Sequence, residues 1–209
     1  MTHSHDRTLL ASLGFSDPDK REQLHDLACE YLTETERAIR LVRIANPPET
    51  GPISVRTILE SEISKGEGQY RTTIGFLDLR IDWIGETRKG VVLVEVKILS
   101  VSIGDILRQI ALYRGYLAAS GGGSVYAQSS LSTETFAARL RAMSDASGPK
   151  KSGPIDTGMS WVLASVFKPV SGQLQTLREA NIAHVHLGEG FTKWFEERCK
   201  QPVPKLEEF

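Results

Sequence analysis

Two charged side chains interrupt an otherwise apolar segment of the sequence, GVVLVEVKI at residues 90–98. The apolar run predicts a buried strand, in which Glu95 and Lys97 would lie on the same face with their Cβ atoms roughly 6–7 Å apart. Charged side chains are rarely buried unless they are paired or bound to another group. We therefore expect these two residues to have a chemical role at the end of the strand.

An acidic strand precedes this segment in the chain. Residues 71–84, RTTIGFLDLRIDWI, alternate with a period of two, which places Asp78 and Asp82 on one face. Pairing of this strand with residues 90–98 as a hairpin could bring an aspartate beside Glu95. Two converging carboxylates repel each other unless a cation lies between them, and oxygen ligands of this kind suit Mg²⁺. A lysine beside such an ion could orient or deprotonate a water, as metal-assisted phosphodiester cleavage requires.

The surrounding segments predict an α/β fold, because helical and strand patterns alternate along the chain. Apolar residues recur at spacings of three and four over residues 20–45, which predicts one amphipathic helix or two in succession. Residues 53–63 alternate loosely and predict a strand, with a short helix around Glu60 as the alternative. The elements expected after residue 98 are a helix (102–119), a short helix (133–143), a strand (161–167), a helix (171–182), a strand (183–188) and a last helix (191–199).

The order and spacing of these motifs resemble the PD-(D/E)XK nuclease superfamily. Asp82 in RID is followed after thirteen positions by Glu95 in EVK at a strand end, and QIALY in the next helix matches the Q-x-x-x-Y motif of RecB-type members. The resemblance extends over residues from about 58 to 117. It implies a restriction-endonuclease-like fold, with a mixed β-sheet flanked by helices, and a deoxyribonuclease that depends on Mg²⁺ or Mn²⁺.

The resemblance also implies roles for individual residues. Asp82 and Glu95 would bind the metal, with Asp78 as the alternative aspartate that the spacing favours less. The carbonyl of Val96 would be a further ligand, and Lys97 would be the catalytic lysine.

Four more positions would complete the site. Gln109 and Tyr113 would support the site or the nucleic-acid strand. Glu60 or Glu62 in ILESEI would supply the upstream glutamate of the superfamily, unless His25 replaces it as a histidine does in some RecB-type members. Two arginines near these motifs could contact phosphates or could be ordinary solvated charges: Arg80 and Arg108.

Length and composition limit the number of domains and the class of protein. The chain has 209 residues, of which 40% are hydrophobic and 24% charged, with a formal net charge of −1. We expect one domain over residues 1–209, with a helical part (about 19–45), a catalytic core (about 53–117), a flexible insertion (about 120–160) and a strand–helix part (about 161–209). Two cysteines do not make a disulfide framework, and no apolar window reaches the length of a membrane span, so a cytoplasmic protein is expected.

Alternatives to a nuclease remain open from the residues alone. The same fold could be a catalytically inactive module that binds DNA or a protein partner, or the motif could be coincidental in an unrelated α/β protein. DNA is the expected partner, and a homodimer would suit a concerted double-strand cut. His184 and His186 alternate on a predicted strand, where we expect a structural pair because no carboxylate or cysteine lies at ligand spacing.

Overall fold

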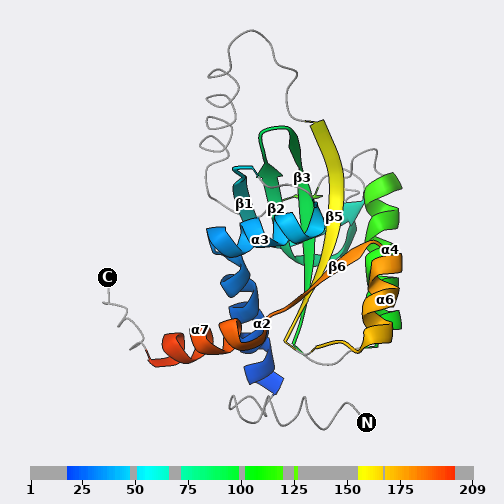
Figure 1. Cartoon of the computed structure of the whole chain (residues 1–209). Helices are drawn as coiled ribbons and strands as arrows, with labels where there is room; N and C mark the ends of the chain where they lie inside the picture. Colours follow the sequence, from blue (N-terminus) through cyan, green and yellow to red (C-terminus); the bar gives the residue numbers. More distant parts are fainter. Residues whose placement is uncertain are drawn as a thin grey trace, which may run out of the picture.

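The computed structural model is an α/β structure in which helices cover both faces of one mixed sheet (Figure 1). It describes residues 18–47, 51–65, 72–98, 102–119, 125–126, 155–166 and 168–200. In these ranges the expected α/β class and mixed sheet are confirmed.

The helices and strands follow the predicted order closely. They are α2 (Pro18–Thr33), α3 (Thr35–Ala45), β1 (Ser54–Lys65), β2 (Thr72–Ile84), β3 (Arg88–Lys97), α4 (Ile103–Ala119), β4 (Val125–Tyr126), β5 (Ile155–Ser165), α6 (Ser171–Glu179), β6 (Ile182–His186) and α7 (Gly188–Lys200). The N-terminal segment forms two helices, and residues 53–63 lie mostly in a strand. The strand predicted at 161–167 begins earlier, at Ile155. The short helix expected at 133–143 lies outside the described residues.

The described strands form a six-stranded sheet in the order β4-β1-β2-β3-β5-β6. β1 pairs antiparallel with β4 and with β2, and β2 pairs antiparallel with β3. β3, β5 and β6 are parallel neighbours. Because parallel neighbours need a crossover connection, the chain passes through α4 between β3 and β5 and through α6 between β5 and β6.

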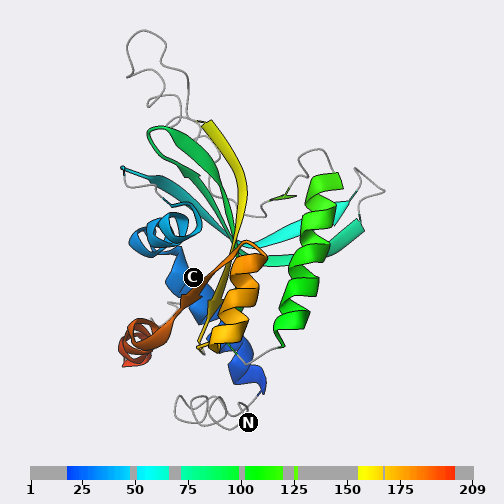
Figure 2. The same cartoon turned by 45° about the vertical axis from the view of Figure 1, so that its right-hand side comes forward.

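Two apolar clusters hold the helices on the sheet, one on each face. In the first cluster, α2, α3 and α7 pack on residues such as Val92 and Val94. In the second, α4 and α6 pack on residues such as Leu93 and Leu163 (Figure 2). The alternation of Val92, Leu93 and Val94 between the two clusters is the period of two expected for a central strand. None of the helices in the described ranges combines the length and apolar character that a membrane crossing requires.

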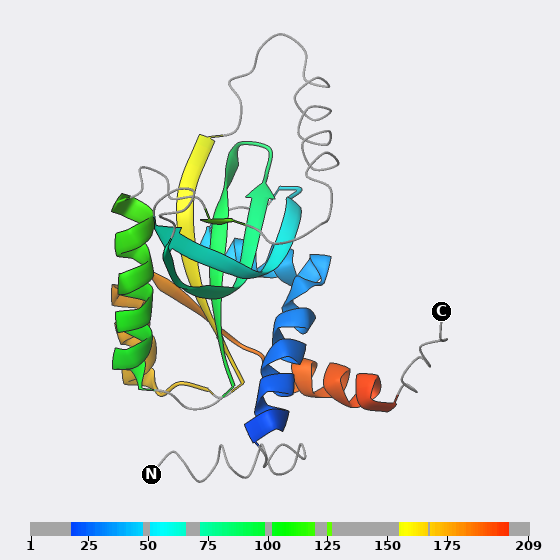
Figure 3. The same cartoon turned by 180° about the vertical axis from the view of Figure 1, so that it is seen from behind.

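A bend in β2 interrupts the alternation predicted for this strand. Leu79 belongs to the cluster under α2, whereas Leu77, two residues earlier, belongs to the cluster under α4. Glu60, which lies across from this point on β1, has a φ of 48°, and Figure 3 shows the curved hairpin from behind. Pairing between β2 and β3 ends here, with Leu79 opposite Val94. Beyond this pair the two strands diverge, and Asp78, Glu95 and Lys97 lie at this divergence.

Candidate active site

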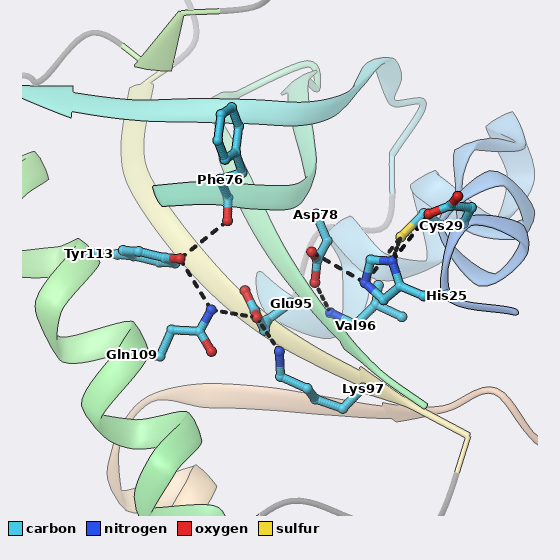
Figure 4. A network of polar contacts seen from close by, with 10 residues as sticks. His25, Cys29, Phe76, Asp78, Glu95, Val96, Lys97, Gln109 and Tyr113 are labelled. Carbon is cyan, nitrogen blue, oxygen red and sulfur yellow. Dashed lines mark hydrogen bonds and ion pairs between the residues drawn. The ribbon is translucent and has the colours of Figure 1, made fainter. Parts of the chain in front are cut away.

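Glu95 occupies the centre of the polar cluster at the end of β3. Its side chain is almost fully buried, with 1% of the residue exposed. The Oε1 atom accepts hydrogen bonds from Lys97 Nζ at 2.5 Å and from Gln109 Nε2 at 2.7 Å (Figure 4). The Oε2 atom is also buried, and it has no hydrogen-bond partner among the described residues. A buried carboxylate oxygen without a partner is costly, so this atom marks a place for a proton, a water or a cation.

The structure places Asp78, and not Asp82, beside this cluster. Asp78 lies one residue beyond the last β2–β3 pair, and its Oδ2 accepts a hydrogen bond from the Val96 amide at 2.6 Å. Asp82 lies opposite Val91, further along the hairpin, and its carboxylate is bound by Arg80 Nε at 2.6 Å. The preference for Asp82 depended on sequence spacing, which does not show where two strands stop pairing.

A histidine from α2 contacts Asp78 at the edge of the cluster. His25 Nε2 lies 3.3 Å from Asp78 Oδ1, and both ring nitrogens lie 3.9 Å from the Cys29 thiol (Figure 4). The hydrogen bond with Asp78, helped by that with Cys29, raises the pKa of His25 to about 11, although burial acts in the opposite direction. A protonated His25 forms an ion pair with Asp78. Burial raises the pKa of the Cys29 thiol, so a neutral thiol is expected there.

The surroundings of Glu95 act on the pKa of its carboxyl in opposite directions. Burial raises the pKa of this carboxyl, and the negative charge of Asp78 raises it further. The ammonium of Lys97 and the amide of Gln109 act in the opposite direction without cancelling the effect. A further positive charge close to Glu95 and Asp78 would lower this pKa, because it would oppose the effects of burial and of the Asp78 charge.

Gln109 and Tyr113 on α4 contact each other and connect α4 with the polar cluster. Gln109 Nε2 contacts both Glu95 Oε1 and the Tyr113 hydroxyl, the latter at 3.2 Å. The Tyr113 hydroxyl donates in turn to the carbonyl of Phe76 on β2, also at 3.2 Å. α4 thus connects the bend of β2 with the carboxylate at the end of β3.

The remaining predicted residues are placed less centrally. Glu60 has an exposed side chain and lies between the β1–β2 pairs Leu59–Leu79 and Ser61–Leu77. Glu62 is 8% exposed and accepts a hydrogen bond from the Thr73 hydroxyl at 2.7 Å. The two arginines predicted to contact phosphates each pair with an acid of their own element, Arg80 with Asp82 and Arg108 with Asp105.

Among the described residues, no group of three or more histidine, cysteine and acidic side chains is placed so that it could hold a metal ion.

Two residues of the cluster, His25 and Cys29, have little or no signal in the sequence. His25 was only a secondary candidate, because nothing in the sequence connects α2 with the bend of β2. Cys29 was not a candidate at all, and its spacing of four from His25 was the signal that the two share a helix face.

The histidine pair on β6 has ordinary structural partners. Ser165 Oγ lies 2.8 Å from His184 Nε2, and His186 Nε2 donates to the carbonyl of Val166 at 3.0 Å. These contacts agree with the expected structural pair. They tie the edge strand β6 to the end of β5.

The His184 environment predicts a loss of stability in mild acid. Burial, with a smaller effect of His186, lowers the pKa of His184 from 6.5 to about 4. The unfolded chain therefore takes up this proton first as the pH falls, and the free energy of unfolding decreases between pH 6.5 and about 4. We expect this decrease to be smaller in His184→Gln, as measured by denaturant unfolding across this pH range. Parallel pH profiles for the two proteins would show that His184 is not responsible.

Comparison of the chain with protein-family models, curated proteins and solved structures gives no match.

Proposed function

We propose that this protein is a divalent-metal-dependent deoxyribonuclease whose active site lies where β2 and β3 diverge. The observation that carries the proposal is the Glu95 carboxylate, which is 1% exposed and whose Oε2 has no partner among the described residues. Burial and the nearby charge of Asp78 both raise the pKa of Glu95. A cation beside the two acids would relieve the repulsion and give the orphaned oxygen a partner. Mg²⁺ and Mn²⁺ are the metals that carboxylate oxygens suit.

Two carboxylates are sufficient for such an ion. Mg²⁺ usually keeps several waters and takes one or two protein carboxylates together with phosphate oxygens of the substrate. Asp78 and Glu95 would hold it here, which is why a group of three protein ligands is not required. When bound, the ion would supply an activated water and neutralise charge on the scissile phosphate. His25 would orient Asp78 from the other side through the 3.3 Å contact.

Lys97 is the residue that we propose to act on the reacting atoms. Its ammonium is held 2.5 Å from Glu95 Oε1, at the open end of β3. From there it would orient the attacking water and stabilise the negative charge that develops on the phosphate. Gln109 would keep the Glu95 carboxylate in place, so that the lysine stays in position.

One feature favours the alternative of a catalytically inactive module. Each acid already has a cationic partner from the protein, Lys97 for Glu95 and His25 for Asp78. A site of this kind could persist without metal as a DNA-binding or protein-binding domain. Metal binding separates the two proposals, because an inactive module of this kind would take up no divalent ion.

A cleavage assay tests the nuclease proposal. Linear, circular and single-stranded DNA are incubated with the protein in Mg²⁺, in Mn²⁺ and in excess chelator. We expect breakdown of DNA with either metal and none with the chelator, because the proposed reaction depends on the cation. Cleavage that continues in chelator, or no cleavage under any condition, would refute a metal-dependent nuclease.

A further inference from the structure

Gly75 on β2 lies directly against the ring of Tyr113. A Cβ atom added at position 75 would lie 2.7 Å from the Tyr113 hydroxyl oxygen, 3.0 Å from Cε1 and 3.2 Å from Cζ. Side chains do not pack this closely, so any residue larger than glycine would displace the ring or the strand. The missing side chain at Gly75 therefore leaves room on β2 for the Tyr113 ring.

The Tyr113 ring lies against the part of β2 that does not pair with β3. Pairing of the two strands ends at Leu79, and the Phe76 carbonyl beyond it is bound by the Tyr113 hydroxyl at 3.2 Å instead of by a strand. Trp161 of β5 stacks on the tyrosine ring with the centroids 6.4 Å apart, so the ring is also held from β5. A backbone carbonyl on an unpaired strand edge needs a partner, and the Tyr113 hydroxyl supplies one for Phe76.

The same hydroxyl reaches the candidate site. Gln109 Nε2 lies 3.2 Å from it and 2.7 Å from Glu95 Oε1. We propose that Gly75 is a positioning residue: the missing side chain seats Tyr113, and Tyr113 keeps Gln109 on the Glu95 carboxylate. If the Tyr113 ring were displaced, the Gln109 amide would no longer be held by the tyrosine hydroxyl. The Glu95 carboxylate would then lose one of its two donors, Gln109, and keep Lys97. The effect on catalysis rests on the proposed nuclease function, whereas the effect on metal binding rests only on the two-carboxylate site.

Four variants test this inference: Gly75→Ala, Tyr113→Phe, the double variant and Gly115→Ala. The last is the matched control, because Gly115 lies on the same helix as Tyr113 and a Cβ added there meets nothing within 4 Å. The affinity for Mn²⁺ is measured by calorimetry, and kcat and KM are measured on DNA. We expect Gly75→Ala to lower both the affinity and kcat by about 10-fold or more with little change in KM, as loss of an orienting partner does. Gly115→Ala should change neither.

The double variant provides the more specific result. Removal of the hydroxyl takes away the atom closest to the new Cβ, so Gly75→Ala should cost much less in a Tyr113→Phe protein than in the wild type. If Gly75→Ala does not fold, the double variant must still bind Mn²⁺ as Tyr113→Phe does. Additive losses, or a Gly75→Ala protein that behaves like Gly115→Ala, would overturn the inference. A wild type that binds Mn²⁺ more tightly than Gly75→Ala yet cleaves no DNA would support the positioning role and reject the nuclease.

Discussion

Lys97→Ala is expected to lower the rate of metal-dependent DNA cleavage by about 10²–10³-fold, the typical cost of removing one group that stabilises transition-state charge. The ammonium lies 2.5 Å from Glu95 Oε1, on the strand end that faces the proposed substrate position. No other lysine among the described residues makes an ion pair with this carboxylate. The rate is measured under single-turnover conditions in Mg²⁺, so that binding and chemistry are separated.

The Lys97 variant needs a control for folding and a control for charge. Removing the lysine leaves a buried carboxylate without its cation, which destabilises a protein by itself. Circular dichroism and thermal unfolding must therefore show that Lys97→Ala is folded under the assay conditions. Lys89→Ala removes the same charge from an exposed position near the start of the same strand and should retain full activity. Equal activity of Lys97→Ala and the wild type would contradict the proposed role.

Asp78→Asn and Asp82→Asn are expected to give opposite results. Asp78 contacts the Val96 amide and His25, and its charge acts on Glu95, so its neutral amide should reduce cleavage by at least about 100-fold. Asp82 pairs with Arg80 on its own strand, across from Val91, so its amide should leave the rate close to that of the wild type. Rates are compared in Mg²⁺ and in Mn²⁺, with folding checked as for the lysine variants.

The two amide variants are a matched pair. Both change one carboxylate to an isosteric amide on the same strand, so a general effect of lost charge would appear in both proteins. Loss of activity in Asp82→Asn alone would return the metal site to the residue that sequence spacing favours. Equal loss in both would mean that the divergence of β2 and β3 does not define the site.

The sequence is sufficient to predict the elements but not their exact pairing. Alternation in residues 71–84 and 90–98 predicts both strands, because a period of two is a local property. The bend of β2, where Leu77 and Leu79 point into different apolar clusters, interrupts that period and has no sequence motif of its own. Asp78 lies at that bend and contacts the Val96 amide, whereas Asp82 lies within the paired part of the hairpin, and sequence spacing does not show this difference.

Contacts between elements that are far apart in the sequence could also not be predicted. His25 comes from α2 and meets Asp78 because α2 packs on the sheet face where β2 bends. Gly75 reads as an ordinary glycine in a strand until Tyr113 is placed against it. Gln109 and Tyr113 were predictable because their motif has fixed spacing on one helix, and both lie in the cluster.

Calorimetric titration with Mn²⁺ is the most direct test of a divalent-cation site between Asp78 and Glu95. Wild type, Asp78→Asn, Glu95→Gln and Asp82→Asn are titrated without DNA and again with DNA present. We expect one site in the wild type and in Asp82→Asn, and loss of that site in Asp78→Asn and Glu95→Gln, because only these two acids would hold the ion. Absence of binding to the wild type under both conditions, or equal binding by all four proteins, would contradict the proposed active site.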